Sequence, residues 1–131
     1  MKLLTAFIII NLTCSISHAA YSKKKLISKI KSTNSKISQS KDFKSAYQHF
    51  LKLKKAVYKM KSKPNKDFTY LQGLKFVLDD ITTKNLKTKS ACQGVRTQII
   101  LDNNPHARSV KETPTHAQHG IKLLDSLCRK L

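Results

Sequence analysis

The segment FKSAYQHFLKLKKAVYKM, residues 43–60, decides the fold class of this chain. Its apolar side chains recur every three or four residues and project onto one helical face: Phe43, Ala46, Phe50, Leu53, Val57 and Met60. Lysines occupy the opposite face. Lys54 is the exception, because it projects into the apolar sector, where its stem can pack while its ammonium group reaches solvent. We predict an amphipathic helix with an N-cap at Ser40, Asp42 in its first turn and an end near Ser62.

Helical spacing of apolar residues also precedes and follows this segment. The helix predicted over about residues 22–39 has a thin apolar stripe of Leu26, Ile30 and Ile37, with Thr33 filling the gap. A third helix is predicted from an Asp67 cap to about Ile81. It carries few charges, so we expect it to be the central, buried helix, with an apolar face of Tyr70, Leu71, Leu74, Val77, Leu78 and Ile81.

Two more helices are predicted toward the C-terminus, after a polar loop over residues 82–89. The fourth begins at a Ser90 cap, ends near Asp102 and carries Cys92, Val95 and Ile99. A second polar loop extends to Thr113, which we expect to cap the fifth helix with Pro114 at its first position. The apolar residues of that helix are Ala117, Ile121, Leu124, Cys128 and Leu131. The expected fold is an all-α bundle of about five helices.

The first 19 residues have the order of charge, apolar run and small residues that is typical of an export signal. Lys2 precedes the apolar run over residues 3–12, and Ser17 and Ala19 supply small side chains before a cleavage site. The run is shorter than the roughly 20 apolar residues that span a bilayer. We predict cleavage after Ala19, which leaves residues 20–131 as one basic helical domain. A lipid anchor on Cys14 is the alternative, although no small residue directly precedes that cysteine.

Export determines how the cysteines are interpreted. Loss of Cys14 would leave Cys92 and Cys128 in a compartment where disulfides persist. One begins the fourth predicted helix and the other ends the fifth, so the two can meet only if these helices form an antiparallel hairpin. We predict an intramolecular Cys92–Cys128 disulfide. Free buried thiols or an intermolecular bridge are the alternatives.

Positive charge is concentrated in the N-terminal half of the predicted domain. Residues 20–66 contain 15 lysines and one acid, a net charge of +14, whereas residues 67–131 carry +4. Such an excess costs self-repulsion and favours an anionic partner. We predict that the partner binds the lysine face of the second helix: Lys41, Lys44, Lys52, Lys55, Lys59 and Lys63. The alternative is a structural or partner-binding protein whose lysines only keep it soluble.

The kind of basic residue narrows the class of anion. Lysines outnumber arginines 23 to 3, and arginine is the residue that reads bases and phosphates with a rigid fork. The chain has no Trp, and its Phe and Tyr residues mostly project to apolar faces, which disfavours stacking on single-stranded nucleic acid. A polybasic helix suits an anionic membrane surface or a phosphoinositide-like headgroup. A non-specific nucleic-acid or polyanion binder is the alternative.

Residue types that could support catalysis or metal binding are present without a supporting pattern. His116 and His119 share a helical face near His106, yet no acidic or cysteine ligand has recognisable metal spacing. We therefore expect surface histidines, and a pH-responsive patch is a better hypothesis for them than a metal site. The adjacent Asp79 and Asp80 point about 100° apart and cannot face each other as an acid–base pair. We expect no enzyme activity, no metal and no cofactor, and a monomer.

In its export signal and its lysine-rich body without motifs, the chain resembles the small exported effector proteins of intracellular Gram-negative bacteria. These proteins are often type II secretion substrates. The resemblance implies delivery outside the bacterium, a role in virulence and contact with host membranes. It assigns no function to any individual residue.

Overall fold

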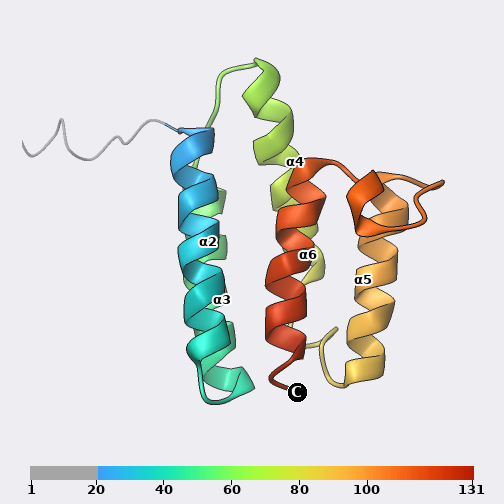
Figure 1. Cartoon of the computed structure of the whole chain (residues 1–131). Coiled ribbons are helices and arrows are strands. Elements are labelled where there is room, and N and C mark those ends of the chain that lie inside the picture. The colour runs from blue at the N-terminus through green and yellow to red at the C-terminus, as the bar shows by residue number, and fades with distance from the viewer. Residues whose placement is uncertain (1–20) are drawn as a thin grey trace, which may run out of the picture.

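A computed structural model describes residues 21–131, and within this range the protein consists of helices without strands (Figure 1). The elements are α2 (Lys23–Gln39), α3 (Phe43–Lys59), α4 (Lys66–Asp80), α5 (Lys89–Asn103), the short 3₁₀ helix η1 (Val110–Glu112) and α6 (Thr115–Cys128). The predicted all-α class and five α-helices are confirmed. The predicted signal peptide, residues 1–19, lies outside the described residues.

Helix α6 lies at the centre of the bundle. It packs against α2, α3, α4 and α5, and Figure 1 shows it between the α2–α3 pair and α5. Two small buried residues on α6, Ala117 and Gly120, let neighbouring helices approach closely. The expectation that the third predicted helix is central is therefore wrong. That helix, α4, buries its predicted apolar face but leaves Phe76 73% exposed on the other side.

The predicted apolar stripes form the core. Leu26, Ile30, Thr33 and Ile37 of α2 are buried, as are most of the predicted positions on α3. Leu86 differs from the prediction, because it lies in a segment predicted as a polar loop and is only 1% exposed. At the C-terminus, α6 ends at Cys128, and Leu131 lies beyond the helix at 38% exposure.

The helix termini differ from the prediction by one or two residues at several places. Ser40 is the C-cap of α2 and its hydroxyl donates to the Lys36 carbonyl, whereas Asp42 is the N-cap of α3. Asn65 caps α4 instead of Asp67, and Thr88 caps α5 instead of Ser90. The observed cap lies two residues after the predicted one in α3 and two residues before it in α4 and α5. Each of these segments offers two oxygen-bearing side chains that could reach the free N–H groups of the first turn, so residue type alone did not decide between them.

The start of α6 differs from the prediction in the identity of its N-cap residue. Its N-cap position is Pro114, which makes no side-chain capping bond, and Thr115 is the first helical residue. The predicted cap, Thr113, is buried and its hydroxyl instead donates to the Val110 carbonyl at 2.6 Å, which closes η1. The Thr113 hydroxyl therefore bonds to the carbonyl of the short 3₁₀ helix in this predicted polar loop, and it does not cap α6.

The Cys92–Cys128 disulfide is confirmed, with the two Cα atoms 6.2 Å apart. It joins the first turn of α5 to the last residue of α6, so these two helices form the expected antiparallel hairpin. A disulfide is consistent with an oxidising, exported compartment. Among residues 21–131, no helix is long and apolar enough to cross a membrane.

Candidate anion-binding face

The predicted lysines lie on the α2–α3 hairpin or its edges, and all are exposed. Lys44, Lys52, Lys55 and Lys59 project from α3, Lys41 precedes its N-cap, and Lys63 follows its C-terminal end. The burial of Ala46, Phe50, Leu53 and Val57 against the bundle turns this lysine side outward. The same logic exposes lysines around the α2 stripe: Lys24, Lys25, Lys29, Lys31 and Lys36.

Acidic residues do little to neutralise this face. Asp42 is the only acid between residues 21 and 66, and its carboxylate accepts a hydrogen bond from the Ser45 N–H at 2.8 Å. That bond, and then Lys41 and Lys44, lower the pKa of Asp42. Lys54, which projects toward the apolar side, lies 3.9 Å from Asp79 of α4, an ion pair that the sequence did not predict. The remaining exposed lysines of the hairpin face solvent without a carboxylate partner in the described chain.

A groove of about 270 Å³ runs between α2 and α3 on the outer side of the hairpin. Helix α2 contributes Lys29, Ser32, Thr33 and Lys36, at i, i+3, i+4 and i+7, and α3 contributes His49, Lys52 and Leu53. No carboxylate is among these lining residues. Of the six predicted lysines, the groove includes only Lys52. The prediction missed Lys29 and Lys36 because they lie on another helix. Their spacing on one face of α2, together with the three-residue turn between α2 and α3, could have indicated that they lie next to Lys52.

Two other depressions adjoin the hairpin and contain carboxylates. Lys63 lines a pocket with Lys61, Tyr21 and Asp67. Asp67 also lines a wider pocket beside Lys23, Lys24 and Lys31. The α2–α3 groove is therefore the more uniformly basic of these surfaces.

The histidines of α6 are half-buried against α4 rather than lying on the surface. The Tyr70 hydroxyl forms a 2.7 Å hydrogen bond with Nδ1 of His119, and burial raises the pKa of Tyr70. His116 donates from Nε2 to Oδ1 of Asn103 at 2.9 Å. Burial lowers the pKa of both histidines, and nearby lysines lower that of His119 further. These imidazoles are core hydrogen-bonding groups at neutral pH.

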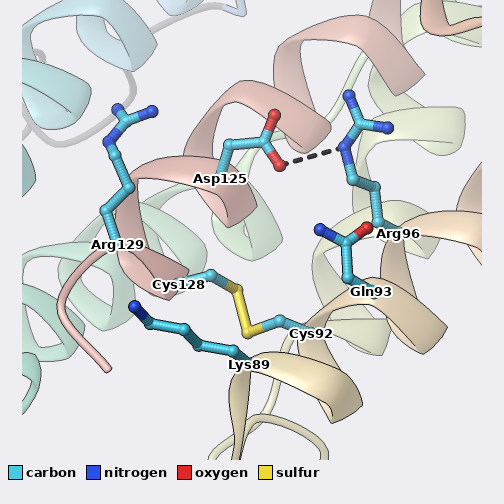
Figure 2. Close-up of a pocket in the computed structure, with 7 residues that line it drawn as sticks. All are labelled: Lys89, Cys92, Gln93, Arg96, Asp125, Cys128 and Arg129. Carbon is cyan, nitrogen blue, oxygen red and sulfur yellow. Dashed lines mark hydrogen bonds and ion pairs between the residues drawn. A yellow bond between two sulfur atoms is a disulfide. The ribbon is translucent and has the colours of Figure 1, made fainter.

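The disulfide borders a pocket of about 430 Å³ lined by two of the three arginines (Figure 2). Arg96 donates from Nε to the Asp125 carboxylate at 3.1 Å, and Arg129 donates to the Ser126 hydroxyl at 3.0 Å. Figure 2 shows the Arg129 guanidinium pointing away from the disulfide. Arg96 thus links α5 to α6, whereas the bond of Arg129 stays within the C-terminal end of α6, and Asp125 already offsets part of their charge.

The acids gather on the α4–α5 side. Asp79, Asp80 and Asp102 line a shallow depression of about 370 Å³ next to Phe76. Burial, Asp102 and then Asp79 raise the pKa of Asp80. Within the described range, no group of three or more His, Cys, Asp or Glu side chains is placed to hold a metal ion.

Comparisons of the chain with protein families, with characterised proteins and with solved structures found no match.

Proposed function

We propose that this protein is exported and binds an anionic membrane surface through the outer face of the α2–α3 hairpin. The observation that carries the proposal is the density of exposed, unpaired lysines on one hairpin, with Asp42 as the only acid in that half. Each lysine near an anionic bilayer contributes about 1 kcal/mol of attraction. Several lysines on one rigid face act together, so binding needs neither an apolar insertion nor an enclosed pocket.

Export is the first part of the proposal and rests on the pattern of residues 1–19 and on the disulfide. Intact mass of the protein from the medium or periplasm should match a chain that begins at Ala20. A mass that includes diacylglycerol on Cys14 would replace a freely exported protein with an anchored one.

A membrane is favoured over nucleic acid by the side chains available on the hairpin. Binding to single strands uses exposed aromatic rings that stack on bases, and Tyr58 is the one large aromatic exposed on α3. The hairpin has no arginine for bidentate contacts to phosphates and bases. Its lysines act as hydrated point charges, which suits a fluid array of lipid headgroups.

Charge reversal on α3 tests the face. The triple variant Lys44→Glu, Lys55→Glu, Lys59→Glu should lose about 3 kcal/mol or more of affinity for phosphatidylserine-containing vesicles, measured by co-sedimentation. The matched control reverses the exposed Lys84, Lys87 and Lys89, outside the hairpin, and should bind much more like the parent. Both variants should keep the parent's helical circular dichroism, since exposed substitutions usually change stability by less than about 0.5 kcal/mol each.

Other outcomes of this experiment reject parts of the proposal. Equal loss in both triple variants would mean that net charge, not the hairpin, governs binding. Undiminished binding in both would leave the lysines as a solubilising face. Duplex DNA that displaces the protein from vesicles at equal phosphate concentration would favour the polyanion alternative over the membrane.

A further inference from the structure

The groove between α2 and α3 has a composition that the flat lysine face around it lacks. Lys29 and Lys36 approach from α2 and Lys52 from α3, and the wall between them carries His49 and the hydroxyl groups of Ser32 and Thr33. Thr33 is 8% exposed, so one end of the wall is part of the packed helix interface. Three lysines, a histidine, a serine and a threonine therefore line one depression.

Within residues 21–131, no carboxylate forms an ion pair with these three lysines. The ion pairs formed in the described chain are Lys54 with Asp79 and Arg96 with Asp125, and neither involves the groove. The nearest acid in sequence, Asp42, caps α3 through Ser45. Three like charges held together by two packed helices cost repulsion, which an anion in the groove would relieve.

We propose that this groove binds a phosphomonoester group and so gives the hairpin a specific headgroup site within its general attraction to anionic surfaces. A phosphomonoester carries about −1.5 to −2 charges at pH 7 and offers three acceptor oxygens. A phosphodiester, as in nucleic acid or phosphatidylserine, carries a single charge. Three ammonium donors match the dianion better, and lysine is an established phosphate ligand acting as a point charge.

The size of the groove agrees with a small ligand group. Its volume of about 270 Å³ lies below the roughly 300–1,000 Å³ of sites that enclose a drug-sized molecule. It would hold a phosphate and part of its carrier, and leave the remainder outside. A phosphorylated inositol lipid and a soluble inositol phosphate present the same group, so both sources are compatible with the site.

This inference rests on the proposed function, and its test separates the two. The probes are soluble inositol 1,4,5-trisphosphate, vesicles with phosphatidylinositol 4,5-bisphosphate, and vesicles with phosphatidylserine at matched surface charge. The groove variant Lys29→Gln, Lys36→Gln, Lys52→Gln is compared with the face variant Lys44→Gln, Lys55→Gln, Lys59→Gln. Both lose three charges from exposed positions of the same hairpin.

We expect the groove variant to lose at least tenfold in affinity for the soluble trisphosphate and for the bisphosphate vesicles. The face variant should lose less than threefold in affinity for the soluble trisphosphate. On phosphatidylserine vesicles the two variants should weaken equally. Backbone amide shifts on adding the soluble probe to the parent protein should be largest at residues 29–36 and 49–52, a measurement that needs no variant. Tighter binding of bisphosphate vesicles than of the soluble probe identifies the lipid as the source, and the reverse identifies a free inositol phosphate.

An equal loss of affinity for the soluble trisphosphate in both variants would overturn the groove site. Amide shifts spread along the whole hairpin would overturn it as well. A parent that binds phosphatidylserine vesicles but not the trisphosphate would reject the groove and leave the proposed function standing. A parent that binds none of the three probes would reject both.

Discussion

At the scale of single residues, two glycines show how tightly α6 is packed at the centre. A Cβ placed on Gly120 would collide with the Val77 side chain of α4, and one on Gly73 of α4 would lie 2.5 Å from the His116 ring. Val77 is 2% exposed and β-branched, so it has little freedom to move aside. Glycine is needed at both positions for close helix approach, since neither has a positive φ.

Gly120→Ala should therefore destabilise the protein despite improving helix propensity. The propensity gain is about 1 kcal/mol, whereas overpacking a core costs typically about 1–3 kcal/mol, so we expect a net loss near 1 kcal/mol in urea unfolding. Gly94→Ala on α5 is the matched control, because nothing lies within 4 Å of its added Cβ. It should stabilise by about 0.5–1 kcal/mol. A stabilising Gly120→Ala would contradict the close α4–α6 contact.

The half-buried histidines should make the fold sensitive to acid. Burial lowers the pKa of His116 and His119 in the folded protein, so the unfolded chain binds protons at these sites at higher pH than the native one does. Stability is then fully present above the ordinary histidine pKa of about 6.5 and falls as pH drops from there toward the lowered native pKa values.

The measurement is the free energy of unfolding in urea at several values between about pH 7.5 and 5, above the range where most carboxylates titrate. His119→Gln should flatten this slope. The exposed His106 is the control, and His106→Gln should leave the slope as it is in the parent. If the stability of the parent does not change over this range, burial does not lower the pKa of these two histidines in the folded protein.

At the scale of elements, α5 depends most on a covalent link. It buries only Cys92 and Ile99 completely, whereas α6 buries seven residues. Helices with little buried surface open at low free-energy cost. The Cys92–Cys128 bond, which closes a separation of 36 residues, offsets this weakness.

Replacing both cysteines with alanine should lower the free energy of unfolding by about 3–4 kcal/mol in the chain-entropy account. Amide hydrogen exchange should increase most in α5, at residues 89–103, and least in the α2–α3 hairpin, which the bond does not join. Equal acceleration in all helices would show that α5 unfolds only with the whole bundle.

At the scale of the whole molecule, charge is separated between two sides. Lysines cover the α2–α3 hairpin, while Asp79, Asp80 and Asp102 share a depression on the α4–α5 side. An anionic surface would therefore attract the hairpin more strongly than the α4–α5 side, which orients the protein as well as binding it.

Salt should act on folding and on vesicle binding with opposite signs. Raising NaCl from about 0.1 M to about 0.5 M shortens the screening length well below 10 Å and relieves lysine repulsion within the hairpin. We expect the urea midpoint to rise while affinity for anionic vesicles falls. The Lys44→Gln, Lys55→Gln, Lys59→Gln variant should show a smaller rise in midpoint. A midpoint that falls with NaCl in the parent would contradict uncompensated repulsion on the hairpin.

The helical class, the apolar stripes, the exposure of Lys44 and Lys55 and the pairing of Cys92 with Cys128 were all determined by the sequence itself. The first three follow from a spacing of three or four residues, and the pairing follows from the two thiols that remain once the predicted cleavage removes Cys14. Such patterns can be read along one chain without knowing which helices pack together. Only the tertiary structure decided that α6 is the central helix, that Leu86 is buried, and that Lys29 and Lys36 share a groove with Lys52 and His49. These facts depend on which faces of different helices meet, and a periodicity within one helix specifies its buried face but not its partner.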